Sequence, residues 1–339
     1  MSRLVTVVMY HFVRDLEGSR YPKIKGLDVS HFDQQVAYLL RHYNVISMQE
    51  LVAAAKDSAA PLPERPLLLT FDDGYIDHFT CVFPILSRYG VPGAFFPPAK
   101  AILERRVLDV NKIHFLLAAV DDTQVLVEEI KRRIVEEGPE NRLEKPEYYF
   151  RRCTGDHRYD PPEVTFVKRA LQRELPEAYR AQLTDALFSA FVSDDEASFA
   201  NELYMSEEQL ACLVRHGMYV GSHGYAHYWL NTVDKNTQSE EVRKGLEFIA
   251  SVGTPLEDWV MCYPYGGYDD SLIEVLKEAG CGLALTADAA IADLDNDGRF
   301  VIPRLDTNDL PKQADAMPNS WTQQVINVSA TEWEGSAYS

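Results

Sequence analysis

The stretch LLLTFDDGYIDHF, residues 67–79, joins an apolar run to two adjacent aspartates and a glycine. The run at 66–71 predicts a strand that is buried on both faces, as in a parallel sheet. Asp72 and Asp73 repel each other when both are ionised, so placing them at the end of a buried strand has an energetic cost. Such a pair before glycine is also a common turn signal, so the aspartates need support from elsewhere in the chain.

Short apolar runs alternate with amphipathic stretches along much of the sequence. We place the start of one helix at Ser30, which would cap it. This alternation predicts a parallel sheet or an α/β barrel. The expected strands lie at 4–10, 44–47, 66–71, 91–98, 218–223, 259–266 and 282–286, and the expected helices at 30–43, 48–56, 76–89, 238–252 and 269–279.

The alternation stops between about residues 101 and 210. This stretch is rich in Glu, Arg, Leu and Ala at helical spacing. We therefore predict one α/β domain at 1–310, interrupted by a mainly helical insertion at 101–210. The insertion is a candidate lid and a candidate surface for self-association. Residues 311–339 form a C-terminal tail with weak periodicity, which we expect to be loosely held.

Composition limits the classes of partner. The chain has 339 residues and a formal net charge of −19, which repels nucleic acid and anionic membrane surfaces. No apolar stretch approaches the roughly 20 residues that span a bilayer. The N-terminal stretch reads as a first strand rather than a signal peptide, and the five cysteines form no CxxC pair. We therefore expect a cytoplasmic protein without a disulfide framework.

Polar residues follow two further expected strands. His223 and His227 lie in GSHGYAHYWL (221–230), and Tyr265 lies in CYPYGG (262–267). The carboxyl ends of strands in α/β folds meet at a shared cleft. Two histidines four residues apart can reach one ion, and Asp73 is a suitable third ligand.

A bound cation would also offset the repulsion between the adjacent aspartates, because both carboxylates can then stay ionised. Asp73 would bind the ion, and Asp72 would be left to take a proton from water. Each motif alone has a structural explanation as a turn, a cap or packed histidines. Their joint occurrence at three strand ends favours a metal site.

The ordered motifs TFDDG (70–74), SHGYAH (222–227) and YPYGG (263–267) resemble those of the polysaccharide deacetylase family, the NodB-type carbohydrate esterases. The resemblance covers roughly 1–100 and 205–305 and skips the insertion. It implies an irregular (β/α) barrel that removes acetyl groups from N-acetylated sugars with a divalent metal. We expect Zn²⁺, with Co²⁺, Ni²⁺, Mn²⁺ or Fe²⁺ as alternatives.

Carried over residue by residue, the resemblance implies Asp72 as the general base. The same match implies Asp73, His223 and His227 as the metal ligands. Tyr265 would lie where a backbone N–H of the family helps to bind the oxyanion, and we also expect it to contact the substrate.

Two positions depart from the family pattern. Gly224 stands where many members have Ser or Thr, and Cys262 stands where the family has an arginine that pairs with the base. We hypothesise that Arg304, in VIPRLD (301–306), supplies this cation from another direction. The alternative is a surface arginine.

The general acid of the family usually lies in a late Leu-x-His motif, but no histidine follows His227 here. In members that resemble the exopolysaccharide N-deacetylases, whose motifs are circularly permuted, an early Tyr-His pair serves instead. The segment MYHFV (9–13) places His11 directly after the first expected strand. We therefore predict His11 as the general acid, with a packing role as the alternative.

The insertion contains a concentration of cations in YYFRRCTGDHRYD (148–160), which includes His157 and Arg158. Arginine binds phosphates bidentately, and aromatic rings stack on sugars. We predict that Arg151 and Arg152 contact the substrate, for example a phosphorylated or nucleotide-linked sugar. The alternative is a solvated loop with local salt bridges.

Together these observations predict a metal-dependent hydrolase that removes an N-acetyl group from an amino sugar or sugar conjugate in surface-glycan biosynthesis. One alternative is an allantoinase-like amide hydrolase of the same fold. Another is an Fe(II) oxygenase, although its ligands usually come as His-x-Asp, whereas here the aspartate precedes both histidines. The third is a non-catalytic sugar-binding module, since the motif arginine and the late histidine are both missing.

Overall fold

The computed structural model describes residues 3–154 and 160–327. The chain forms two compact units: the first contains Met1–Asp15, Gly26–Glu104 and Asn201–Ser339, and the second contains Leu16–Lys25 and Arg105–Ala200. The sequence places the insertion at 101–210 as one continuous segment, whereas the second unit also takes in residues 16–25. Within the described residues, no helix is both long and apolar enough to cross a membrane.

The strands of the first unit follow one another around a ring. In one sheet, β1 pairs with β5, β5 with β6, and β6 with β7, all in parallel. A bridge between Ser222 and Met261 leads on to the parallel pair β8 and β9, and a bridge between Leu285 and Ile302 leads to β11, which pairs with β1. The predicted α/β barrel is therefore confirmed. The strands of the ring are β1 (Leu4–Tyr10), β5 (Pro66–Asp72), β6 (Ala94–Phe96), β7 (Tyr219–Val220), β8 (Val260–Cys262), β9 (Leu283–Leu285) and β11 (Leu305–Asp306).

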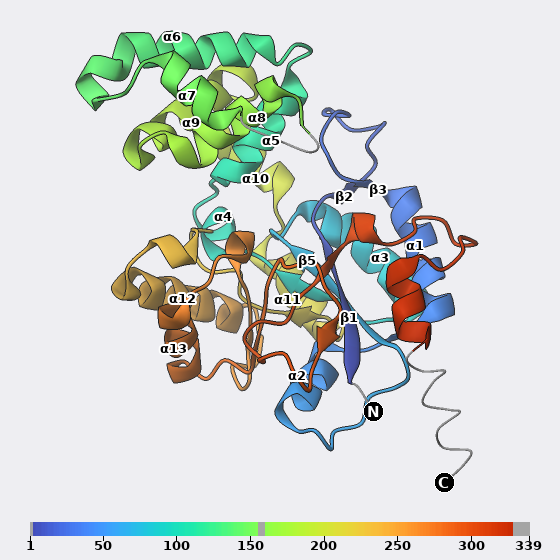
Figure 1. Ribbon diagram of the computed structural model, residues 1–339. Coiled ribbons are helices and arrows are strands. Elements are labelled where there is room, and N and C mark those ends of the chain that lie inside the picture. Colours follow the sequence, from blue (N-terminus) through green and yellow to red (C-terminus); the bar gives the residue numbers. More distant parts are fainter. Residues whose placement is uncertain (1–2, 155–159, 328–339) are drawn as a thin grey trace. The chain divides into compact units, whose positions relative to one another are not determined.

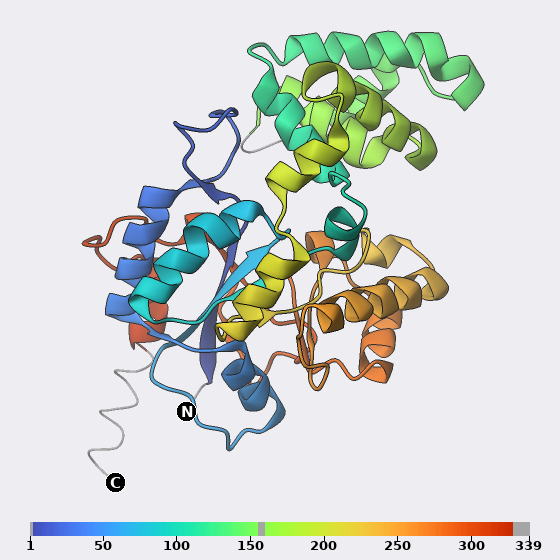
Figure 2. The same cartoon turned by 180° about the vertical axis from the view of Figure 1, so that it is seen from behind.

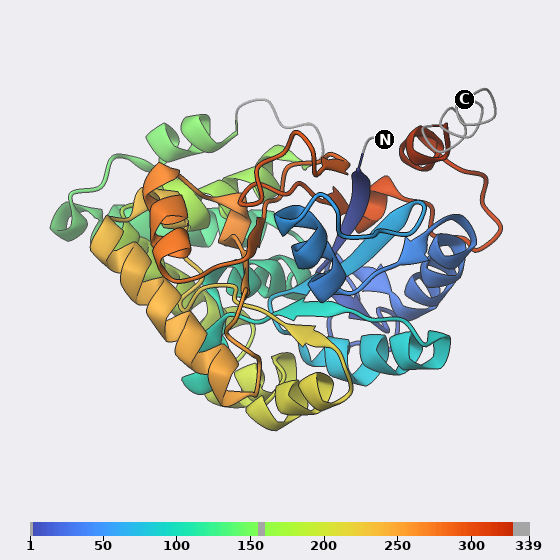
Figure 3. The ribbon, with the colours of Figure 1, turned by 90° about the horizontal axis from the view of Figure 1, so that it is seen from below.

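Four short strands extend this framework. β10 (Ala292–Asp293) is antiparallel to β1, β4 (Asn44–Val45) is parallel to β5, and β2 (Val13–Arg14) pairs with β3 (Leu27–Asp28). Helices cover the outside of the strands, as the views from the front, from behind and from below show (Figures 1, 2 and 3). The helices of this unit are α1 (Val29–His42), α2 (Met48–Lys56), η1 (His78–Val82), α3 (Phe83–Tyr89), α4 (Ala99–Leu103), α11 (Glu207–Arg215), η3 (Leu230–Thr232), α12 (Lys235–Ser251), η4 (Pro264–Gly266), α13 (Asp270–Glu278) and η5 (Thr307–Asp309).

The strand β5 is buried along its whole length, and its two faces pack in different places. Leu67, Leu69 and Phe71 belong to the apolar cluster that also contains helix residues. Leu68 belongs to a second cluster, with residues of β1, β8 and β9. Because strand side chains alternate between faces, Thr70 and Asp72 lie on the same face as Leu68. The strand thus directs Asp72 toward the inside of the barrel.

Two details differ from the sequence-based expectations. The helix α1 begins at Val29, and its cap is Asp28, whose side chain accepts a hydrogen bond from the backbone N–H of Ser30. The described part of the tail, residues 311–327, packs against the rest of the first unit and is not loosely held. Thr322 is fully buried. Its hydroxyl hydrogen-bonds the hydroxyl of Tyr38, which lies on α1, and that of Tyr43, which caps the C-terminal end of α1. Residues 328–339 lie outside the described part of the chain.

The second unit is helical and has its own apolar core. The buried members of its main apolar cluster lie between positions 113 and 187. Inside this unit the buried ammonium of Lys112 pairs with Asp185 and Glu196, so the charge is compensated where it is buried. The helices are α5 (Asp109–Ala119), α6 (Gln124–Asn141), α7 (Pro146–Cys153), α8 (Pro162–Arg169), η2 (Ala170–Glu174), α9 (Glu177–Phe191) and α10 (Glu196–Leu203), whose last turn belongs to the first unit.

The close packing of β6 against β7 gives a test of the barrel. A Cβ at Gly221 would lie 2.4 Å from Cε1 of the buried Phe96 ring. We expect Gly221→Ala to lower the free energy of unfolding by about 1–3 kcal/mol through overpacking, as measured by chemical denaturation. Gly138→Ala in α6, where the new Cβ meets only ordinary contacts, should be neutral or stabilising. If Gly221→Ala is as stable as the wild type, the space between Gly221 and Phe96 must be larger than the structure shows.

Candidate functional site

The turn after β5 separates the two aspartates. Asp72 is the last residue of the strand, whereas Asp73 has a φ of +70° and Gly74 a φ of +68°. The backbone N–H of Asp73 donates to the carbonyl of Phe96 at 3.1 Å, which anchors the turn to β6. A Cβ at Gly74 would lie 2.7 Å from Cβ of Pro97, so this position requires glycine for space as well as for conformation. The strained turn gives each carboxylate its own surroundings.

Asp73 faces the two histidines that the sequence pairs with it. Its Oδ1 lies 3.6 Å from Nε2 of His223 and 3.3 Å from Nε2 of His227, and all three side chains are buried. This oxygen has no hydrogen-bond partner among the described residues, although it is fully buried. Burial raises the pKa of Asp73, but the neighbouring imidazoles lower it more strongly, so the net pKa is well below its ordinary value. The unsatisfied carboxylate oxygen and the two imidazole nitrogens make three ligand atoms that suit a divalent cation.

Further contacts orient two of these side chains, His223 and Asp73. The Nδ1 of His223 lies 2.7 Å from the carbonyl oxygen of Cys262, which can only accept, so we assign the proton to Nδ1 and leave Nε2 free as a ligand. The hydroxyl of Tyr75 donates to Oδ2 of Asp73 at 2.6 Å. Asp73 is therefore left with Oδ1 as its ligand atom. Such outer contacts typically fix the orientation of metal ligands.

Asp72 is held by a buried arginine from the far end of the sequence. Nη1 and Nη2 of Arg304 lie 3.0 and 2.8 Å from the two oxygens of Asp72. Arg304 also donates to the carbonyl of Thr286 at 2.7 Å and to the hydroxyl of Thr70 at 3.1 Å. Burial raises the pKa of Asp72, but the Arg304 guanidinium outweighs it, and the pKa falls to about 2. Asp72 is thus ionised and fixed in orientation.

Cys262, the last residue of β8, contacts the same carboxylate. Its Sγ lies 3.4 and 3.5 Å from the two oxygens of Asp72, and burial raises the pKa of the thiol, which stays neutral as a donor. Asp72, His223 and Cys262 also come close enough to form a second candidate ligand group. Since Arg304 and the thiol already bind both oxygens of Asp72, this group is a poorer cation site than the one around Asp73.

His11 follows β1 and lies within electrostatic reach of the site. Its electrostatic effect contributes, after burial and closer partners, to lowering the pKa of both Asp72 and Asp73. Its carbonyl lies 2.8 Å from Nε2 of His78, a fully buried side chain to which sequence reasoning assigned no role. Burial lowers the pKa of His78 to about 4, so His78 is neutral and supports the backbone of His11.

An aromatic wall stands beside the histidines. Tyr265, with a φ of +57°, packs edge-on against His227 at a centroid distance of 4.6 Å. Trp229 also stacks on Tyr265, with ring centroids 4.6 Å apart and planes 3° apart. Trp229 is 42% exposed, so part of the wall is accessible to solvent. The sequence argument included Tyr265 but missed Trp229.

The predicted substrate-binding arginines lie on α7 in the second unit. Arg152 pairs with Glu174 at 2.8 Å, and Nε of Arg151 donates to the carbonyl of Glu147 at 3.3 Å. Both are exposed, and their contact with substrate stays a prediction. His157 and Arg158 lie outside the described residues.

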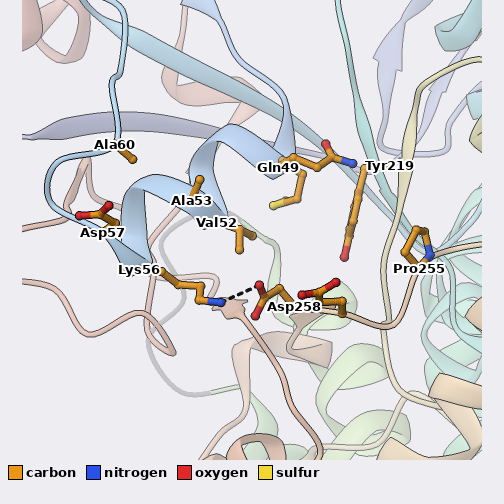
Figure 4. A pocket seen from close by; sticks show the side chains of 11 residues that line it. Gln49, Val52, Ala53, Lys56, Asp57, Ala60, Tyr219, Pro255 and Asp258 are labelled. Atoms are coloured by element: carbon orange, nitrogen blue, oxygen red, sulfur yellow. Dashed lines mark hydrogen bonds and ion pairs between the residues drawn. The ribbon is translucent and has the colours of Figure 1, made fainter.

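A separate pocket of about 500 Å³ lies beside α2 and contains none of these residues. Figure 4 shows its side chains, with Val52 and Ala53 on α2 and Tyr219 and Pro255 across from them. Nζ of Lys56 bonds Oδ2 of Asp258 at 2.6 Å at its edge. The lining surface is mostly apolar, and the ammonium group of Lys56 is already paired with Asp258.

Comparison with known proteins identifies similar sequences and folds. The family model described as polysaccharide deacetylase matches residues 59–141 and 179–284. The poly-β-1,6-N-acetyl-D-glucosamine N-deacetylase of Escherichia coli K12 is 32% identical over 91 residues, which is 26% of this chain and only 13% of that protein.

Two solved structures share the fold. The Streptococcus pyogenes deacetylase PplD, solved in complex with acetate, has a TM-score of 0.56 at 15% identity and covers 96% of this chain and 98% of its own. IcaB from Ammonifex degensii has a TM-score of 0.52 at 18% identity and covers 95% of this chain and 96% of its own.

The buried ion pair gives a thermodynamic test of the site. Arg304→Met leaves the charge of Asp72 buried and unpaired, so we expect the free energy of unfolding to fall by about 3–5 kcal/mol. Adding Asp72→Asn removes that charge, so the double variant should lose clearly less than the sum of the two single variants. Arg88→Met, which removes an exposed pair with Asp33, should change stability by less than about 1 kcal/mol. Additive effects of the two buried substitutions would contradict the pairing.

Proposed function

Because the chain belongs to the polysaccharide deacetylase family, we propose that it is a metal-dependent hydrolase that removes the N-acetyl group from an amino sugar. One observation carries this proposal: three ligand atoms converge on one point, and a separate ionised carboxylate is fixed beside them. A metal-dependent hydrolase uses both features, one to bind an ion and one to accept a proton.

For the substrate we propose an N-acetylated glycan of surface-polysaccharide biosynthesis. The E. coli relative is named for poly-β-1,6-N-acetyl-D-glucosamine. The segment that matches this chain is a small part of that protein. The partly exposed Trp229 beside Tyr265 supports a sugar ligand, because pyranose rings stack on aromatic rings.

We propose Asp73, His223 and His227 as the residues that hold the ion, and Zn²⁺ as the ion. Two imidazoles and one carboxylate are a common ligand set for catalytic zinc, although Co²⁺, Ni²⁺, Mn²⁺ and Fe²⁺ accept the same donors. When bound, such an ion supplies Lewis acidity toward the amide carbonyl and lowers the pKa of water.

Three groups around the proposed ligands would supply the general base, the oxyanion contact and the general acid. Asp72, ionised and oriented by Arg304, would accept the proton of the attacking water. The backbone N–H of Tyr265 would donate to the oxyanion, and His11 would give a proton to the leaving amine. Amide hydrolysis then balances: the C–N bond breaks, water supplies the new C–O bond, and the products are acetate and a free amine.

The pairing of Asp72 with Arg304 favours hydrolysis over a non-catalytic sugar-binding module. That alternative rests partly on the absence of an arginine from the third motif, at Cys262. In the structure Arg304, the residue before β11, supplies a cation to the same carboxylate. A buried, ionised carboxylate next to a ligand cluster has no evident use in sugar binding alone.

Acetate release tests the proposed activity. We expect the zinc-loaded protein to release acetate from oligomers of N-acetylglucosamine, and Asp72→Asn to lower kcat by about 10²–10⁴-fold because the base is lost. Acetate would be measured enzymatically alongside circular dichroism of each variant. No release from any N-acetylated sugar by folded, zinc-bound protein would reject the proposal.

The role of His11 requires a separate variant. His11→Ala should lower kcat by about 10²-fold or more at neutral pH with KM little changed, because a proton donor acts mainly on the chemical step. His31→Ala, which removes an exposed histidine from α1, is the matched control and should leave turnover unchanged. Unchanged turnover of His11→Ala would assign the acid to another group.

A further inference from the structure

The loop that carries both histidine ligands has no regular secondary structure to hold it. Residues 223–227 belong to neither a helix nor a strand. Gly224 has a φ of +72° and His227 a φ of +60°, which is unusual for a residue with a side chain. A backbone in this conformation persists only where the surrounding groups hold it.

Two of the carbonyl groups in this loop are bound by the start of α4. The backbone N–H of Ala99 donates to the carbonyl of Gly224 at 3.3 Å, and that of Lys100 donates to the carbonyl of Tyr225 at 2.9 Å. The N–H of Gly224 donates to the hydroxyl of Ser222 at 3.2 Å. These contacts leave the N–H groups of the next two residues to be satisfied.

A single carboxylate oxygen on α12 accepts both of them. Oε2 of Glu241 lies 3.0 Å from the N of Tyr225 and 2.8 Å from the N of Ala226. Glu241 is only 5% exposed. One turn along the same face of α12, a Cβ at Gly245 would lie 2.6 Å from the hydroxyl of Ser222, so the helix lies directly against the loop.

We propose that Glu241 is a positioning residue that fixes the peptide groups between His223 and His227 and so sets the spacing of the two imidazoles. The inference rests on the proposed metal site. Without this acceptor, two partly buried N–H groups would lose their partner, and the loop would relax to satisfy them elsewhere. The two imidazoles would then no longer be held in place for a common ion.

Two substitutions separate the role of the acceptor oxygen of Glu241 from the role of its negative charge. Glu241→Gln keeps an oxygen at the same reach and removes the charge. Glu241→Asp keeps the charge but shortens the side chain by one methylene, so its oxygen cannot reach both N–H groups. The same two substitutions at Glu247, an exposed residue of α12 paired with Arg243, are matched controls.

Zinc affinity of the full chain is the first readout, measured by competition with a chelating dye. We expect Glu241→Asp to weaken Zn²⁺ binding by about 10–100-fold, and Glu241→Gln and both Glu247 variants to stay within about 3-fold of wild type. Wild-type affinity of a folded Glu241→Asp, or equal losses in the Asp and Gln variants, would overturn the proposal.

Hydrogen exchange of the metal-free protein is the second readout and does not depend on zinc. Peptides that contain Tyr225 and Ala226 should exchange at least about 10-fold faster in Glu241→Asp than in wild type, whereas peptides from β5 should not change. Unchanged protection of the loop in Glu241→Asp would also overturn the proposal. If the wild-type protein binds no zinc, the proposed metal site fails, and hydrogen exchange alone decides the role of Glu241.

Discussion

The structure of the site depends on how two adjacent buried carboxylates are kept ionised. Asp72 ends β5 and faces into the barrel, where Arg304 binds both of its oxygens. Asp73 turns away in a left-handed conformation, with Tyr75 on one oxygen and two imidazoles near the other. Their repulsion is thus offset by different partners rather than by distance alone. The division also gives the carboxylates different chemistry, one suited to accept a proton and the other to bind an ion.

Three residues with a left-handed backbone lie where these side chains meet. Asp73, His227 and Tyr265 all have φ values between +57° and +70°. The first two lie in segments held by neighbouring groups: the turn after β5 by the carbonyl of Phe96, and the histidine loop by α4 and Glu241. Residues in this conformation gather at functional sites because the rest of the fold compensates for them. The rigid barrel therefore carries the strain that places the side chains.

Much of the fold could be predicted because its signals are local. Fully apolar runs alternating with amphipathic helices indicated the barrel, and three motifs at strand ends indicated the family, which the family match confirms. The supporting residues gave no such signal. Tyr75, His78 and Glu241 stand in ordinary strand-end or helix sequence, and only their buried contacts with the site reveal a role. Asp28, not Ser30, caps α1 because either residue type suits a cap and the backbone decides between them.

By itself the sequence determined which chemical groups stand at the strand ends and that the strands are buried on both faces. It named Arg304 as a candidate partner of Asp72 but could not choose between that role and a surface position. The choice was made by tertiary structure, since the two residues are 232 positions apart and meet only because β11 pairs with β1 and closes the ring. Local patterns encode strands and turns, whereas the partner of a buried charge is set by closure of the whole barrel.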